Sequence, residues 1–269
     1  MRIGWACCIA VLPLVAAPSL GGEADTMARK MIWNDEFDGP AGQLPNPAQW
    51  QFDVGTDWGN AQLEFDTNRP ENVSLDGEGH LVFTARQEEF EGQPYTAGRI
   101  KTKDLFEQRY GRFEARIKLP IGQGIWPAFW MLGENLDEVG WPQCGEIDVM
   151  EYRGHEPDII HGTIHGPGYK GDDSIGNRSV LDEGNYHLDF HVFAVEWNAD
   201  GITWSMDGQT YHRAGPKDLP AGKEWVYDRP FFILLNLAVG GRWVGSPDED
   251  TEFPQTMLVD WVRVYEAAQ

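Results

Sequence analysis

Hydrophobic residues past position 30 recur with a period of two, which is the spacing of β-strands that bury one face. In the run 112–118, Phe113, Ala115 and Ile117 alternate with charged residues, as expected of an antiparallel strand with one wet face. Turn-forming sequences such as Asp207-Gly208 separate short runs of this kind. The pattern predicts an all-β sandwich or jelly roll, and no helical stripe of useful length competes with it.

The run 231–239 lacks this alternation, because almost all of its residues are apolar. Such a strand is expected to be covered on both faces. Asn236 is the polar residue inside the run and therefore needs a hydrogen-bond partner or a ligand. Alternation returns in the run 258–265. We find no internal repeat or low-complexity linker, so we predict one domain from 31 to 269.

The first thirty residues have the composition of an export signal followed by a linker. A single positive charge at Arg2 precedes an apolar run that ends in small residues at Ala16 and Ala17. The apolar run is short for a membrane span. We therefore predict a secreted protein whose residues 1–30 are signal peptide and linker. Two of the three cysteines lie in this segment, which leaves Cys144 alone and excludes an internal disulfide.

Charge and aromatic content narrow the choice of partner. The formal net charge is -22, from 43 acidic and 21 basic side chains. This charge repels phosphate backbones and anionic membrane surfaces, so we expect neither nucleic acid nor a membrane as partner. We also expect the protein to be a monomer. The chain also has 12 Trp residues, whose flat apolar rings suit the faces of sugar rings as well as they suit a core.

Three carboxylates fall within the β-forming run 145–152. Glu146 and Asp148 are two positions apart and share a face, whereas a regular strand would turn Glu151 to the other face. One extra residue, a β-bulge near Val149-Met150, would bring Glu151 back beside them. The alternative is that Glu151 points into solvent or onto the second sheet.

Three carboxylates in one cleft suit glycoside hydrolysis. Repulsion and desolvation push their pKa values apart, so that one group ionises while another keeps its proton. The reaction needs a carboxylate to attack the anomeric carbon and an acid to protonate the departing oxygen. A single strand surface would place them roughly 5–5.5 Å apart, the separation that predicts retention of configuration. A metal site is the rival use, but no histidine lies at tight ligand spacing to the acidic run.

The string Glu146-Ile147-Asp148-Val149-Met150-Glu151 resembles the bulged acidic motif of glycoside hydrolase family 16. The resemblance implies that Glu146 is the nucleophile, Glu151 the acid/base and Asp148 an assistant that shares a proton with the nucleophile. Within the family the sequence is similar to laminarinases, which are endo-acting on β-1,3-glucans and have a concanavalin-like jelly roll with a concave substrate cleft. Further matching strings are 35–37, 95–100, 124–132, 161–166, 236–241 and 260–265.

Several tryptophans are candidates for the walls of such a cleft. Trp126 and Trp130 are four positions apart, so on a strand both rings share a face, with Ala128 between them. We interpret the pair as a stacking platform, although a core pair under the second sheet would have the same spacing. Trp141, before the acids, and Trp243, after a glycine pair, are weaker candidates for contact with sugar.

Polar candidates for binding sugar hydroxyls come from the resemblance. It points to Asn60, Glu64 and Arg99, each of which could instead be an ordinary surface or hairpin residue. His165 shares strand parity with His161, and near the acids it could bind substrate or tune Glu151, or else be a buried structural histidine. Asn236, polar in an apolar run, is also assigned to the cleft.

The resemblance also implies a calcium ion on the convex side of the fold. Its ligands would be Glu36, a backbone carbonyl near Gly79 and the side chain of Asp260, and oxygen ligands suit Ca²⁺. This ion would be structural, and no cofactor is expected for the chemistry.

The sequence therefore predicts a retaining endo-β-1,3-glucanase that acts on β-glucan polysaccharide, with mixed β-1,3/1,4-glucan as a further substrate. The bulge argues against the unbulged Glu-x-Asp-x-Glu motif of lichenases and xyloglucan transferases. Agarases and carrageenases of the same family are the alternative enzymes. They are disfavoured because sulfated or anionic polysaccharides would require a basic cleft. A non-catalytic β-glucan-binding lectin is the alternative from another class, disfavoured because both glutamates are present.

Overall fold

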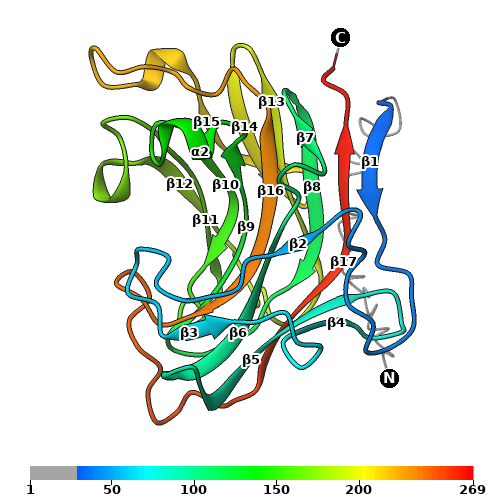
Figure 1. The fold of residues 1–269 in the computed structure, drawn as a ribbon. Coiled ribbons are helices and arrows are strands. Elements are labelled where there is room, and N and C mark those ends of the chain that lie inside the picture. Colours follow the sequence, from blue (N-terminus) through cyan, green and yellow to red (C-terminus); the bar gives the residue numbers. More distant parts are fainter. Residues whose placement is uncertain (1–28, 269) are drawn as a thin grey trace, which may run out of the picture.

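The computed structural model describes residues 29–268 and consists of two stacked, mainly antiparallel β-sheets (Figure 1). The sheet that carries the acidic run has the strand order β2-β6-β16-β9-β10-β11-β12, and each neighbouring pair is antiparallel. The short strand β7 pairs with the beginning of β16. The strands of this sheet are β2 (Gln51–Phe52), β6 (Gln93–Lys101), β7 (Glu107–Gln108), β9 (Ile125–Gly133), β10 (Glu146–Tyr152), β11 (Ile159–His165), β12 (Ile175–Val180) and β16 (Phe231–Val239).

The second sheet has β17 at its centre, with β1 and β5 pairing along one side and β8 along the other. From β8 it continues through β13, β14 and β15, and β4 pairs with β5. These strands are β1 (Met31–Asp35), β4 (Val73–Leu75), β5 (Leu81–Phe90), β8 (Gly111–Lys118), β13 (His191–Asn198), β14 (Gly201–Met206), β15 (Gln209–Ala214) and β17 (Gln255–Tyr265).

The two sheets are joined at one end, where β5 also pairs with β6. Next to this junction the strand β3 (Glu64–Asp66) runs parallel to β6. Helical structure in the described residues is limited to the short elements α2 (Leu136–Val139), η1 (Gly171–Asp173) and η2 (Pro216–Asp218). None of the helices among these residues is long and apolar enough to cross a membrane. The all-β prediction is therefore confirmed, whereas the predicted signal segment lies outside the described residues.

The core lies between the two sheets and follows the predicted alternation. Phe113, Ala115 and Ile117 of β8 are fully buried. The opposite face of β8 departs from the prediction of a wet face, because Arg112 and Glu114 are also buried. Arg112 donates to the Glu114 carboxylate at 2.7 Å, so an ion pair satisfies the charges on this face.

Strand β16 is buried along its whole length, as its apolar sequence predicts. It lies between β6 and β9 in the interior of the cleft-bearing sheet, so neither edge nor face is free. This arrangement places Asn236 in register with Arg99 of β6 and Ala128 of β9. The residues predicted to line the cleft come from three separate stretches of sequence, and they thus lie on adjacent strands.

Candidate active site

Strand β10 contains the predicted bulge. Asp148 is opposite Thr163 of β11 and Glu151 is opposite His161, so three steps along β10 correspond to two along β11. The same extra residue is seen against β9. Because Val149 and Met150 are both buried in the core, the alternation of faces is reset before Glu151. The bulge is confirmed, and Glu151 lies on the same face as the other two acids.

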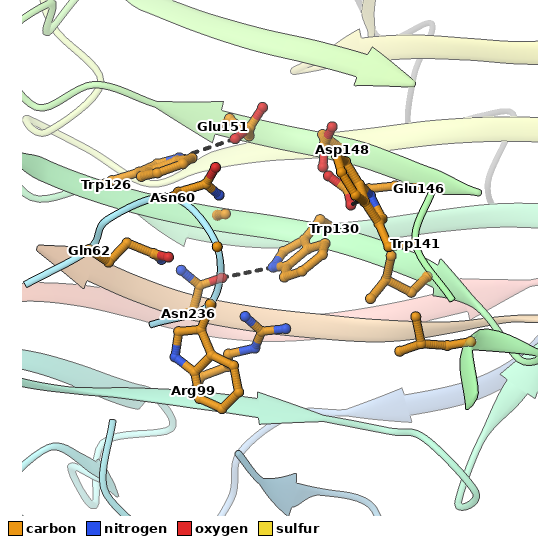
Figure 2. A pocket seen from close by; sticks show the side chains of 15 residues that line it. Asn60, Gln62, Arg99, Trp126, Trp130, Trp141, Glu146, Asp148, Glu151 and Asn236 are labelled. Carbon is orange, nitrogen blue, oxygen red and sulfur yellow. Dashed lines mark hydrogen bonds between the residues drawn. The ribbon is translucent and has the colours of Figure 1, made fainter. Parts of the chain in front are cut away.

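The three carboxylates project into one cleft (Figure 2). The Trp141 indole donates to Glu146 Oε2 at 2.7 Å, and the Trp126 indole donates to Glu151 Oε1 at 3.1 Å. Each outer carboxylate therefore has its own N–H donor. Asp148, between them, is 2% exposed, which makes it the most deeply buried of the three.

His165 completes this cluster from β11. Its Nε2 lies 3.2 Å from Asp148 Oδ2 and 3.9 Å from Glu146 Oε1. Its Nδ1 accepts the backbone N–H of Gly171 at 3.1 Å, which leaves Nε2 as the nitrogen that carries a proton. In this tautomer the proton on Nε2 lies near Asp148 Oδ2, although the contact does not have the geometry of a hydrogen bond.

The position of His165 overturns the spacing argument against a metal. Although His165 is distant from the acids in sequence, the β10–β11 pairing sets it opposite Glu146. One ligand atom each from Glu146, Asp148 and His165 lie within 4.8 Å of one another, a geometry that a metal ion could use. An ion bound there would occupy the oxygens of Glu146, so it would compete with covalent chemistry at that residue.

Burial raises the pKa values of all three acids. Burial, and then the charge of Asp148, raise the pKa of Glu146 to about 8. Burial raises the pKa of Glu151 to about 7, although the nearby His165 opposes the increase. Burial and the charge of Glu151 raise the pKa of Asp148 well above its ordinary value. Near neutral pH some of these carboxyl groups are therefore protonated while others are ionised, as acid/base chemistry at that pH requires.

These shifts predict an unusual dependence of stability on pH. A carboxyl whose pKa is raised by folding binds its proton more tightly in the folded chain, so stability is lost as pH rises through the folded pKa. For Glu151 the window runs from its ordinary pKa of 4.5 to the folded pKa of about 7. We expect Glu151→Gln to match the wild type near pH 4.5 and to be more stable by ~1–3 kcal/mol at pH 8.

Urea unfolding of both proteins at the two pH values measures this difference, which includes the release of Asp148 from the charge of Glu151. Glu138→Gln, which removes an exposed carboxylate from α2, is the matched control and should show no such pH-dependent gain. An equal effect of Glu151→Gln at both pH values would show that burial does not raise this pKa.

One side of the cleft is an aromatic cavity of about 320 Å³. Trp126 and Trp130 both line it, so the predicted platform faces the cleft and not the core. The Trp130 indole donates to Asn236 Oδ1 at 2.7 Å, which supplies the partner that the buried asparagine needs (Figure 2). Asn60 and Arg99 also line this cavity, as predicted.

On the other side of the acids lies a larger and more polar cavity of about 890 Å³ over β11 and β12. Trp243 and His165 line it, as predicted, together with His161. The two cavities share Asn60, Trp126, Trp141, Glu146 and Glu151. The acids therefore lie where the cavities meet, and a long ligand can extend past them in both directions.

Comparison with known proteins agrees with this geometry. The family model described as Glycosyl hydrolases family 16 matches residues 56–263, which is most of the chain. The chain belongs to glycosyl hydrolase family 16. A β-glucanase of Rhodothermus marinus is 39% identical over 263 residues, which cover 94% of this chain and 91% of that protein.

Solved structures of family 16 enzymes superpose on the whole sandwich. The endo-β-1,3-glucanase of Pyrococcus furiosus has a TM-score of 0.85 and 47% identity, over 90% of this chain and 95% of its own. The laminarinase catalytic domain of Thermotoga maritima MSB8 has a TM-score of 0.84 and 46% identity, over 90% and 99%. The protein is therefore a glycoside hydrolase with the jelly-roll fold of this family.

Glu64, one of the predicted sugar ligands, does not line this family 16 cleft. Glu64 is completely buried, and its Oε2 accepts the backbone N–H of Val239 at 2.8 Å. It does not line either cavity, whereas Gln62, two positions earlier, does. The pairing of β3 with β6 explains the error, because it sets the Glu64 carboxylate against the backbone of Val239 at the end of β16 and not in the cleft.

Trp58 is a cleft residue that the sequence argument did not single out. The Arg99 guanidinium lies 4.7 Å from the Trp58 ring centroid and 4.8 Å from that of Trp130, so it is shared by two aromatic faces. Asp53 accepts from Arg99 Nε at 3.0 Å and fixes its orientation. A tryptophan beside the Gly59-Asn60 pair was the available signal, but nothing in its spacing connected it with Arg99.

The strand register of the second sheet brings the predicted calcium ligands near one another. β1 pairs with β17 as far as Val262, and β5 pairs with it up to Val259, so Asp260 lies in the gap between them. Glu36 directly follows β1 and Gly79 closely precedes β5, which brings both to this gap. The placement fits a cation bound by oxygen atoms.

The Glu36 side chain does not fit the proposed ligand role. Arg263 donates to both of its carboxylate oxygens, at 2.9 and 2.7 Å. This pairing lowers the pKa of Glu36 and leaves its backbone carbonyl as the group available to a cation. Asp260 pairs with Arg116 through Oδ2, so its other oxygen is the one to consider.

Proposed function

We propose that this protein is a retaining endo-β-1,3-glucanase that also accepts mixed β-1,3/1,4-glucan. The observation that carries the proposal is the bulged strand, which presents Glu146, Asp148 and Glu151 side by side in the cleft. The similar proteins named above include endo-β-1,3-glucanases and laminarinases, which supports the choice of substrate.

The proposed reaction uses the two outer carboxylates in opposite roles. Glu146 attacks the anomeric carbon while Glu151 protonates the departing glycosidic oxygen, which gives a glycosyl ester on Glu146. Glu151, now ionised, then takes a proton from water as that water attacks the ester and releases the sugar. The Trp141 indole donates to Glu146 and favours its ionised form, and Asp148 is the neighbour with which we propose that Glu146 shares its proton.

Endo-action follows from the position of the acids between the two cavities. A glucan chain can occupy the aromatic cavity with one part and the polar cavity with the next, so cleavage does not require a chain end. Release of reducing ends from laminarin, compared with lichenan, agarose and carrageenan, tests the substrate. Faster cleavage of agarose or carrageenan would overturn the proposal, as would binding of laminarin without cleavage.

The stereochemical prediction is retention of the β configuration. Both acids are on one strand face, and only a close pair leaves no room for water to attack opposite the leaving group. Proton NMR during the first minutes of hydrolysis should show the β-anomer of the new reducing end before mutarotation produces the α-anomer. Appearance of the α-anomer first would establish inversion and a different use of the carboxylates.

For the second sheet we propose a structural calcium ion held by Asp260 with the backbone carbonyls of Glu36 and Gly79. Its contribution would be to tie β1, β5 and β17 together, far from the cleft. A chelator should then lower the melting temperature by several degrees while activity at low temperature remains. Restoration by Ca²⁺ in excess is the control, and an unchanged melting temperature would remove the proposal.

The remaining features fit an exported enzyme that acts alone on polysaccharide. The signal-like segment supports export, and the net charge of -22 supports the absence of nucleic-acid partners. We include secretion and a monomeric state in the proposal. Fractionation of the producing cells and sedimentation of the purified protein test these two points.

A further inference from the structure

Two buried carboxylates lie behind the cleft wall and take no part in the proposed reaction. Glu64 is completely buried and Asp66 is 2% exposed, both on the short strand β3. Burial raises the pKa of Asp66 to about 7, and burial and the charge of Asp66 raise that of Glu64 well above its ordinary value. Burying acids in this way costs stability, so a function for them is expected.

Asp66 holds the indole of Trp58. Its Oδ2 accepts the Trp58 Nε1 proton at 2.8 Å. Its backbone also forms a two-way bridge with Gly55, with N···O distances of 3.0 and 2.7 Å. One residue therefore fixes both the base of the segment 53–63 and the ring that this segment carries into the cleft.

Trp58 in turn belongs to a wall far from the bond that is cleaved. Its ring, Arg99 and the ring of Trp130 form a continuous stack in the aromatic cavity. Arg99 is on β6, three strands away from β10, which corresponds to roughly 14 Å across the sheet. Figure 2 shows Arg99 on the side of the cavity opposite the acids.

We propose that Asp66 is a positioning residue that sets the preference of the enzyme for longer chains. By holding the Trp58 indole against Arg99, it keeps a flat surface ready for a glucose unit that is remote from the cleaved bond. Ordering this surface in advance lowers the cost of binding the distant sugar. The inference rests on the proposed glucanase function and adds a residue to it.

The proposal separates Asp66 from its neighbour Glu64. Glu64 accepts a backbone N–H of β16 and does not line the cavities, although its charge interacts with those of Asp66 and Arg99. Asp66 acts on the ligand through the side chain of Trp58, whose indole it holds. Asn at position 66 retains an oxygen that can accept the indole proton, whereas Leu has the same branched outline, with methyl groups in place of the oxygens, and no acceptor.

The experiment measures kcat/KM for a β-1,3-linked hexasaccharide and trisaccharide, with Asp66→Leu, Asp66→Asn and Glu64→Gln. We expect Asp66→Leu to lower the hexasaccharide-to-trisaccharide ratio of kcat/KM about 5- to 10-fold, mainly through KM for the hexasaccharide. Asp66→Asn should restore most of the ratio. Glu64→Gln should lower the ratio less than Asp66→Leu does, because it leaves the hydrogen bond from Trp58 to Asp66 in place.

Trp58→Phe keeps a ring but lacks the N–H, so it provides a test if Asp66→Leu fails to fold. It should lower the same ratio, and Asp66→Asn added to it should cause no further loss. Where Asp66→Leu folds, the double variant with Asp66→Leu should likewise show no further loss. Equal losses on both substrates, or additive losses in the double variant, would overturn the role of Asp66. Failure of the wild type to cleave either oligosaccharide would instead count against the glucanase proposal itself.

Discussion

Replacing Glu146 with Gln is expected to lower kcat by a factor on the order of 10⁴ or more while the protein stays folded. The amide cannot form the glycosyl ester, and it is close in size to the carboxyl that it replaces. Binding should survive, because the Trp141 indole can still donate to the amide oxygen. Reducing-sugar release measures the loss, and calorimetric titration with a β-1,3-oligosaccharide measures the binding.

Glu138→Gln is the matched control for this variant, because it removes an exposed carboxylate three residues before Trp141. It should retain the activity of the wild type. Turnover by Glu146→Gln within tenfold of the wild type, after removal of deamidated protein, would show that Glu146 is not the nucleophile.

Replacing Glu151 with Ala is expected to lower hydrolysis of natural glucan by about 10²–10⁴-fold, the usual contribution of a general acid/base. The first step then lacks its proton donor, and the second lacks its base. An aryl β-glucoside chain with a good leaving group bypasses the first requirement. Azide bypasses the second, because as an anionic nucleophile it attacks the glycosyl ester without base assistance.

Addition of azide should therefore accelerate Glu151→Ala on the aryl substrate and give a β-glycosyl azide, identified by mass spectrometry and proton NMR. The same azide should not accelerate Glu146→Gln, which forms no ester to be attacked. If azide rescued Glu146→Gln and not Glu151→Ala, the two roles would have to be exchanged.

The fold and the catalytic strand could be predicted because their signals are local. Alternation of apolar and polar residues identified β8 before any contact was known, and the continuous apolar run identified β16 as an interior strand. The bulge followed from parity alone, since Glu146 and Glu151 are an odd number of residues apart and must share a face to act together.

The resemblance to family 16 added candidate site residues whose positions are not fixed by any local sequence pattern. It placed Asn60 and Arg99 in the cleft correctly, and both line the aromatic cavity. It placed Glu64 there as well, whereas the structure buries Glu64 against the backbone of Val239. The difference arises because the position of Glu64 depends on how β3 meets β6 and β16, which are distant in sequence.

By itself the sequence determined the sandwich and its buried strands, because each depends on a period of two within one segment. It predicted the bulge that sets three acids on one face, and the strand pairing confirmed it. The tertiary structure alone decided that His165 lies beside Asp148 and that Arg99 is stacked between Trp58 and Trp130. These contacts depend on which strands pair and in what register. That register is set by packing of the whole core and by hydrogen bonds between segments far apart in the chain.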